Sequence, residues 1–297
     1  MEIPTWRKDG VEQHNNPEFI KIAAKIKTLA ESFNLKFRNI DKRVYEISFD
    51  GSGDEVVGIH AYADVVPVTP ENWVPKDGTR LDPFKITLIG DRMYGRGTED
   101  DKNGIVVTLY AMKVIKEEKL PLVRNLKLLV DTTEETTGDA IPYYFERNPT
   151  PNYNLALDGG YPVVIAEKGY GTVMANFAKR NGGDFQMSAK VDGKDVKLTV
   201  TGVSAHSSEP ECNPEGEWVK ALRAISTENL GMKHEFGTSA GATSVHELPN
   251  GVQFGLAMPN VKYTGHTDGE FKTMEQFQLD LQIVTEMIGR IGQLPKL

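Results

Sequence analysis

The sequence has almost no cysteine and no long apolar run. Cys212 is the single cysteine among 297 residues, which excludes an internal disulfide and a metal site built from several thiolates. No stretch approaches the roughly 20 consecutive apolar residues that a membrane-spanning helix requires. The first residues also lack the basic segment and apolar core of a signal peptide. We therefore expect a cytoplasmic protein that does not associate with a membrane.

Clusters of basic residues are missing as well. The 42 acidic residues outnumber the 34 Lys and Arg residues, so the formal net charge is −8. Without a basic patch the protein has nothing to neutralise a phosphate backbone, and we do not expect nucleic acid as a partner. A hydrophobic fraction of 39% in a chain of this length is typical of a globular protein with a large buried core.

The apolar residues that are present repeat in patterns typical of alternating helices and strands. Asn16 can cap a first helix that begins at Pro17, and its expected apolar positions are Phe19, Ile20, Ala23, Ile26, Ala30 and Phe33. Helical spacing also occurs at residues 105–115, 214–225 and 277–291, and runs typical of strands occur at 44–49, 56–63, 126–130, 155–157 and 254–258. Strands that alternate with helices predict an α/β fold, with a mostly parallel sheet and helices on both faces.

The pattern changes after residue 168. Apolar and polar residues alternate near Val196, and Asp192-Gly193 is a turn signal for a hairpin. Helical spacing then returns. We therefore predict one larger domain in two parts, residues 1–168 and 213–297, separated by a small antiparallel insertion at residues 169–212.

Acidic residues follow the ends of the predicted strands. Asp64, the pair Glu134-Glu135 and Asp158 each come after a strand, and Asp100 lies in a loop directly before a helix. The carboxyl ends of parallel strands meet at one edge of the sheet, where ligands bind in open α/β folds. Converging carboxylates raise each other's pKa, so a cation is a natural way to keep them ionised. The pattern predicts a divalent metal site.

Each of these residues has a plainer interpretation when it is taken alone. An aspartate after a strand, such as Asp64, is more often a turn or cap residue. The pair Glu134-Glu135 could be a solvated loop or could divide the roles of base and metal ligand. His266 could be a polar loop residue or a ligand.

Six blocks of the sequence, taken together, resemble one family. The blocks are Tyr62-Ala63-Asp64-Val65-Val66-Pro67, Gly95-Arg96-Gly97-Thr98-Glu99-Asp100-Asp101-Lys102, Thr133-Glu134-Glu135-Thr136, Asp158 ahead of Tyr161-Pro162, Ser204-Ala205-His206 and Gly265-His266. They occur in the order found in the co-catalytic zinc peptidases, which include aminoacylase, acetylornithine deacetylase, succinyl-diaminopimelate desuccinylase and carnosine-type dipeptidases. The Tyr143-Tyr144-Phe145 segment is most similar to the bacterial dipeptidases.

The resemblance implies a metal-binding role for five positions. Asp100 would bridge two metal ions, Asp158 would complete one site, and Glu135 with His266 would complete the other. Zinc is the implied metal, as one or two ions, with manganese or cobalt as alternatives. The family's remaining ligand is a histidine at the position that Tyr62 occupies here.

The resemblance also implies three catalytic roles. Glu134 would be the general base, and Asp64 would orient the ligand two residues before it. His206, in the inserted segment, would stabilise the oxyanion, and in dimeric relatives this histidine reaches the neighbouring subunit's site. A homodimer is therefore a possible assembly.

Two departures from the family suggest weakened activity. A neutral phenol at position 62 is a poor metal ligand because its reference pKa is about 10 and metal ligands must be deprotonated. We favour Tyr62 as an aromatic that fills the space of the lost ligand over Tyr62 as a phenolate ligand. The inserted lid at residues 169–212 is also shorter than the family's complete lid domain.

We predict metal-dependent hydrolysis of an amide bond in a small peptide, in particular a dipeptide. Two alternatives stay open: a relative that keeps the fold without catalysis, and a deacylase whose substrate is an acyl amino acid.

Overall fold

The computed structural model describes residues 1–74, 78–168, 189–191, 194–196, 207–208, 212–232, 236–239, 241–245, 248–294 and 297. Its helices are α1 (Pro17–Ser32), α2 (Lys102–Glu117), α3 (Ala140–Phe145), α4 (Glu217–Leu230) and α5 (Met274–Gln293), with 3-10 turns at Gln13–Asn15 and Pro70–Asn72. Among these described residues, no helix is long and apolar enough to cross a membrane.

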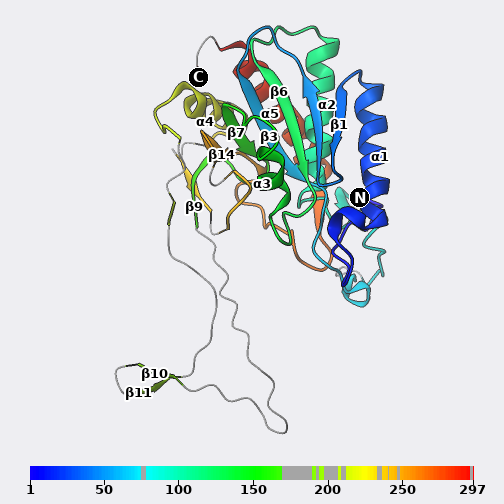
Figure 1. Ribbon diagram of the computed structural model, residues 1–297. Coiled ribbons are helices and arrows are strands. Elements are labelled where there is room, and N and C mark those ends of the chain that lie inside the picture. Colours follow the sequence, from blue (N-terminus) through cyan, green and yellow to red (C-terminus); the bar gives the residue numbers. More distant parts are fainter. Residues whose placement is uncertain are drawn as a thin grey trace.

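The strands form one large mixed sheet and smaller satellites (Figure 1). The large sheet has the order β1 (Lys36–Ile40), β2 (Val44–Phe49), β6 (Asn125–Asp131), β3 (Val56–Tyr62), β7 (Tyr153–Ala156), β14 (Gly251–Gln253), β9 (Val164–Lys168) and β12 (Ser207–Ser208), with β13 (Gly237–Thr238) beside β9. The satellites contain β4 (Thr87–Ile89), β5 (Arg92–Tyr94) and β16 (Phe271–Thr273), β8 (Gly159–Gly160) with β15 (Leu256–Ala257), and β10 (Ala189–Val191) with β11 (Lys194–Val196).

The centre of the large sheet is parallel. Strand β3 pairs in parallel with β6 on one side and with β7 on the other, and β7 pairs in parallel with β14. Strands β1 and β2 extend this core in antiparallel fashion. The predicted α/β class is confirmed, and the parallel centre brings the ends of three strands to one edge of the sheet.

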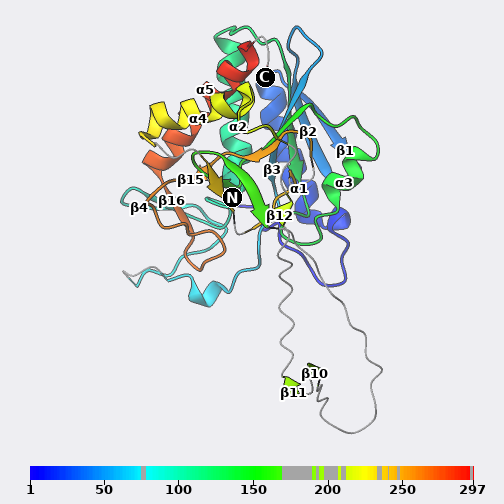
Figure 2. The same cartoon turned by 90° about the vertical axis from the view of Figure 1, so that its left-hand side faces the viewer.

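Helices lie on both faces of the sheet, as predicted (Figure 2). Apolar side chains of α1, α2, α4 and α5 join alternate strand residues such as Ile47, Ile59 and Leu128 in the main core. The short helix α3 packs on the opposite face, against Val44 and Leu129. The alternation of strand side chains between the two faces accounts for this division.

Helix α1 begins as predicted, but one position of its apolar face was wrong. The Asn16 side chain accepts a hydrogen bond from the Glu18 backbone N–H at 3.1 Å, and Pro17 is the first helical residue. Ile20, expected to be buried, is 52% exposed, whereas Ile22 is buried. The helical repeat explains the difference: position 22 lies three residues after Phe19, on the same face, and position 20 is turned away.

The predicted strand at residues 254–258 is divided in two. Strand β14 ends at Gln253 in the large sheet, and β15 begins at Leu256 and pairs with β8 instead. Gly255 between them has a φ of +72°, and a Cβ there would lie 2.5 Å from the Tyr161 ring. The chain therefore changes sheets at a position that only glycine accommodates.

Only parts of the predicted insertion at residues 169–212 belong to the described residues. Strands β10 and β11, on either side of the predicted turn at 192–193, pair in antiparallel fashion, and β12 pairs with β9. Residues 169–188, 197–206 and 209–211 lie outside the described part of the chain. The division into two domain parts and a reduced lid therefore stays a prediction.

A buried histidine connects the sheet to the segment after α4. His60 on β3 is 2% exposed, and its Nε2 lies 3.1 Å from the Asn154 Oδ1 atom on β7. The Asn154 amide donates to the Pro151 and Pro249 carbonyl oxygens, so its Oδ1 accepts from His60 Nε2–H. Nδ1 is then left to accept from the Ser244 hydroxyl at 3.2 Å. Burial lowers the pKa of His60 to about 4.

We expect this histidine to make folding less favourable in acid. Between pH 6.5 and about 4 the unfolded histidine binds a proton and the folded one does not, so stability falls as the pH drops through this window, by on the order of 2 kcal/mol between pH 7 and 5. His60→Gln keeps a donor for Asn154 and cannot titrate. Urea unfolding of both proteins at the two pH values measures the difference, and an equal pH dependence in both would contradict the assignment.

Candidate active site

The acids predicted from the sequence come together at the carboxyl ends of the parallel strands. Tyr62, the last residue of β3, is in register with Asp131, the last residue of β6, and His60 is in register with Ala156, the last residue of β7. The segments that follow these strands carry Asp64, the pair Glu134-Glu135 and Asp158. The parallel pairing therefore gives these acids a common edge, as expected for a ligand site in an α/β fold.

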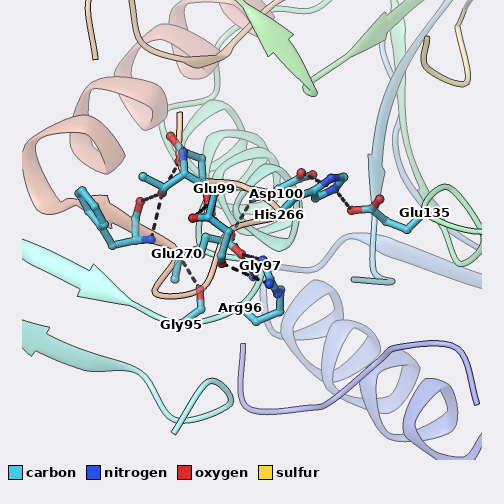
Figure 3. A network of polar contacts seen from close by, with 12 residues as sticks. Gly95, Arg96, Gly97, Glu99, Asp100, Glu135, His266 and Glu270 are labelled. Atoms are coloured by element: carbon cyan, nitrogen blue, oxygen red, sulfur yellow. Dashed lines mark hydrogen bonds and ion pairs between the residues drawn. The ribbon is translucent and has the colours of Figure 1, made fainter. Parts of the chain in front are cut away.

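Asp100, Glu135 and His266 form one compact group (Figure 3). The His266 Nε2 atom lies 3.0 Å from Asp100 Oδ2 and 2.7 Å from Glu135 Oε1, and one ligand atom of each residue lies within 4.8 Å of the others. The side chains of Asp100 and Glu135 are 4% and 7% exposed, and that of His266 is 53% exposed. Two carboxylate oxygens and one imidazole nitrogen are ligands that zinc and similar divalent ions accept. The residues present therefore fit one divalent ion.

The charges of these three residues affect one another because the side chains are in hydrogen-bond contact. Hydrogen bonds to Asp100 and Glu135 raise the pKa of His266 to about 10. Burial opposes ionisation of Asp100, but hydrogen bonds from His266, Tyr62 and Tyr263 lower its pKa. A proton on His266 and a metal ion compete for the same nitrogen, because a metal binds only the deprotonated ring.

Tyr62 lies beside this group as a protonated phenol. Its side chain is 4% exposed, and its hydroxyl donates a hydrogen bond to Asp100 Oδ1. Burial and the carboxylates of Asp100 and Asp158 raise the pKa of Tyr62 well above its ordinary value. Burial, together with Asp100 and Glu134, likewise raises the pKa of Asp158.

Asp64 and Glu134 lie near the same group but make different contacts. Asp64 is fully buried, and its Oδ2 accepts from the Glu135 backbone N–H at 3.0 Å, so it fixes the backbone of the Glu134-Glu135 segment. The predicted support of position 62 by Asp64 stays a prediction. Burial and the carboxylates of Glu135 and Asp64 raise the pKa of Glu134. His206 lies outside the described residues, so its predicted role in stabilising the oxyanion also stays a prediction.

Glu270 holds the loop that carries Asp100, and sequence reasoning missed it (Figure 3). Its carboxylate accepts the backbone N–H groups of Gly97, Glu99 and Asp100 at 3.1, 2.8 and 3.1 Å. It also pairs with the Arg96 guanidinium at 2.7 Å, with both side chains nearly inaccessible to solvent. Three amides and one guanidinium therefore fix the course of this loop.

Glu99 also joins the loop that carries Asp100 to the loop that carries His266. Its Oε2 accepts from the backbone N–H and the hydroxyl of Thr264, at 2.5 and 2.6 Å. Thr264 and Glu270 stand on either side of His266 in the sequence. The loops that supply Asp100 and His266 are thus joined twice by buried carboxylates. Glu270 lies four residues after His266, which is the one sequence signal that could have drawn attention to it.

The chain matches the model of "Peptidase family M20/M25/M40" over residues 58–290. This range includes all the acids of the site together with His266. The chain belongs to this peptidase family.

Two curated relatives are bacterial proteins. "Putative dipeptidase YtjP" of Bacillus subtilis is 33% identical over 141 residues, which are 48% of this chain and 29% of that protein. "Beta-Ala-Xaa dipeptidase" of Lactobacillus delbrueckii subsp. lactis is 36% identical over 128 residues, which are 43% of this chain and 26% of that protein. The chain thus matches less than a third of the length of these relatives.

Solved structures show the same fold at low sequence identity. An M20 family metallo-carboxypeptidase from Sulfolobus solfataricus has a TM-score of 0.69 and 14% identity, with 99% of this chain and 97% of that chain covered. Human carnosine dipeptidase 1 has a TM-score of 0.70 and 9% identity, with 99% and 94% covered.

We expect Glu270→Gln to destabilise the protein by about 3–5 kcal/mol, because it leaves the Arg96 guanidinium buried without its counter-ion. Adding Arg96→Met should recover part of this loss, since no unpaired buried charge then remains. The exposed pair Arg290–Glu228 provides the control, and Glu228→Gln should cost much less stability than Glu270→Gln. Urea unfolding measures all four proteins, and equal losses for Glu270→Gln and Glu228→Gln would contradict the buried role.

Proposed function

We propose that this chain is a metal-dependent dipeptidase. The observation that carries the proposal is the group formed by Asp100, Glu135 and His266, with Glu134 beside it at the carboxyl edge of the sheet. Membership of the peptidase family supports hydrolysis of a peptide bond, and the bacterial relatives named as dipeptidases support a small substrate.

Glu134 is the proposed general base. A divalent ion bound at the three-residue group would lower the pKa of a bound water from 15.7 towards about 7. Glu134 would accept a proton from the attacking water and then pass it to the leaving amine.

The finer features of the proposal come from the resemblance. Zinc is the proposed metal, with manganese and cobalt as alternatives. His206 would stabilise the oxyanion, from the same chain or from the partner in a homodimer, and we place the enzyme in the cytoplasm. A catalytic domain in two parts, residues 1–168 and 213–297, with a reduced lid at residues 169–212 between them, is part of the same proposal.

A second candidate is a relative that keeps the fold without turnover, and the phenol of Tyr62 beside Asp100 is the observation that favours it. Metal content and hydrolysis of dipeptides after addition of zinc, manganese or cobalt separate the two candidates. A parallel panel of N-acyl amino acids separates a dipeptidase from a deacylase. Metal binding without hydrolysis of either panel would overturn the enzymatic proposal.

Glu134→Gln should remove most of the hydrolysis and leave metal content and folding unchanged, because an amide cannot accept the proton of water. Glu135→Gln should instead release metal, because it removes one of the charged ligands. Metal-to-protein ratios, measured beside dipeptide turnover, distinguish the two variants. Loss of metal in both would mean that the division into base and ligand is wrong.

A further inference from the structure

We propose that the Tyr62 hydroxyl takes the place of one of the two metal ions that the resemblance implies, so that this centre binds a single divalent ion through Asp100, Glu135 and His266. The inference rests on the proposed function and specifies its metal centre. Asp158 would then not be a metal ligand.

The reach of the side chain places the hydroxyl where an ion would be. Position 62 is the last residue of β3, directed at the common edge of the parallel strands. A tyrosine extends further than a histidine on the same backbone, and its oxygen passes the point reached by an imidazole nitrogen by about 2 Å, the length of a zinc–nitrogen bond. Tyr62 therefore puts an oxygen atom at the position of the ion that a histidine there would bind.

The contact of the hydroxyl agrees with this position. The phenol has one proton, and it donates this proton to Asp100 Oδ1. The resemblance assigns Asp100 and Asp158 to the same ion as position 62. The hydroxyl thus bonds one of the two carboxylates that would otherwise hold this metal ion.

Asp100 is divided between two neighbours. Its Oδ1 accepts from Tyr62, and its Oδ2 faces His266 Nε2 at 3.0 Å, on the side of Glu135. A carboxylate that bridges two ions supplies one oxygen to each of them. Oδ1 accepts a hydrogen bond from a phenol, and Oδ2 is the oxygen that faces the ligand group, which is complete without Tyr62 or Asp158.

The ring is not free to leave this position. Tyr62 is 4% exposed, in a strand that is hydrogen-bonded on both sides to β6 and β7. The flanking residues Ala61 and Ala63 are buried in the main core. Movement of the phenol out of the site would require the end of the central strand to shift.

Metal stoichiometry tests the proposal without reference to activity. The metal-free protein is titrated with zinc, bound ions per chain are counted by native mass spectrometry, and heats are recorded by calorimetry. We expect one ion for the natural chain and one for Tyr62→Phe, which keeps the ring and offers no ligand. Tyr62→His should bind two ions, because it restores a neutral imidazole and opens the space beyond it.

Asp158→Asn is the matched variant, and it tests whether Asp158 is a metal ligand. In the natural background it should leave the single ion and its affinity unchanged, and in the Tyr62→His background it should remove the second ion only. The absorption of tyrosinate, followed during the titration with Tyr62→Phe as the blank, should not rise. A rise would show a phenolate ligand and overturn the role of Tyr62 as a hydrogen-bond donor.

The outcomes separate this inference from the proposed function. Two ions on the natural chain would overturn the inference and leave the dipeptidase proposal intact. A single ion on Tyr62→His, in a protein with natural unfolding behaviour, would also overturn it. No bound ion on the natural chain at any zinc concentration tested would overturn the proposed metal-dependent function together with the inference that rests on it.

Discussion

The burial of several carboxylates at one edge of a sheet is the constraint on which the rest of this structure depends. Removing a carboxylate from water opposes its ionisation, and each nearby carboxylate adds to the effect. The buried acids at and around the site form two sets, which differ in the groups that stabilise the charged carboxylate. Glu270 pairs with Arg96, and Asp280 pairs with Lys272 at 2.8 Å, with both pairs nearly inaccessible to solvent. The second set, around Asp100, has a titratable histidine and tyrosine hydroxyls as its contacts among the described residues.

This division corresponds to a division of roles. An acid neutralised by a fixed guanidinium or ammonium has a permanent partner and serves to hold loops, as Glu270 does with its three backbone amides. Lys272 also donates to the Leu256 carbonyl oxygen, and Asp280 accepts from the Tyr161 hydroxyl at 3.2 Å, just beyond the segment of Asp158. Among the described residues, Asp100 and Glu135 both contact His266, a partner that can lose a proton or bind a metal instead. The buried ion pair of Glu270 therefore holds in place the loop that carries Asp100.

The main strands and the edge that carries the site could be predicted from the sequence because both depend on local patterns. Apolar runs located the central strands β3, β6 and β7 to within a residue or two, and parallel pairing then fixed where the following acids lie. Strands β1, β4, β5 and β16 were missed because they are short or largely exposed and carry no continuous apolar run. Polar partners were harder still. Glu270 lies 174 residues from Arg96, and no local pattern shows that a buried acid will meet a distant arginine.

Position 62 shows the same limit at the level of a single atom. The sequence reveals that an expected histidine is absent, but only the structure shows that the phenol oxygen lies against Asp100. Catalytic zinc sites characteristically have three protein ligands and one open position, whereas closed sites with four protein ligands are structural. Asp100, Glu135 and His266 supply three ligands, and the exposed His266 leaves this group accessible from solvent on one side. Under the proposal for Tyr62, loss of one ion and loss of catalysis are therefore separate consequences, because the three candidate ligands Asp100, Glu135 and His266 still lie together.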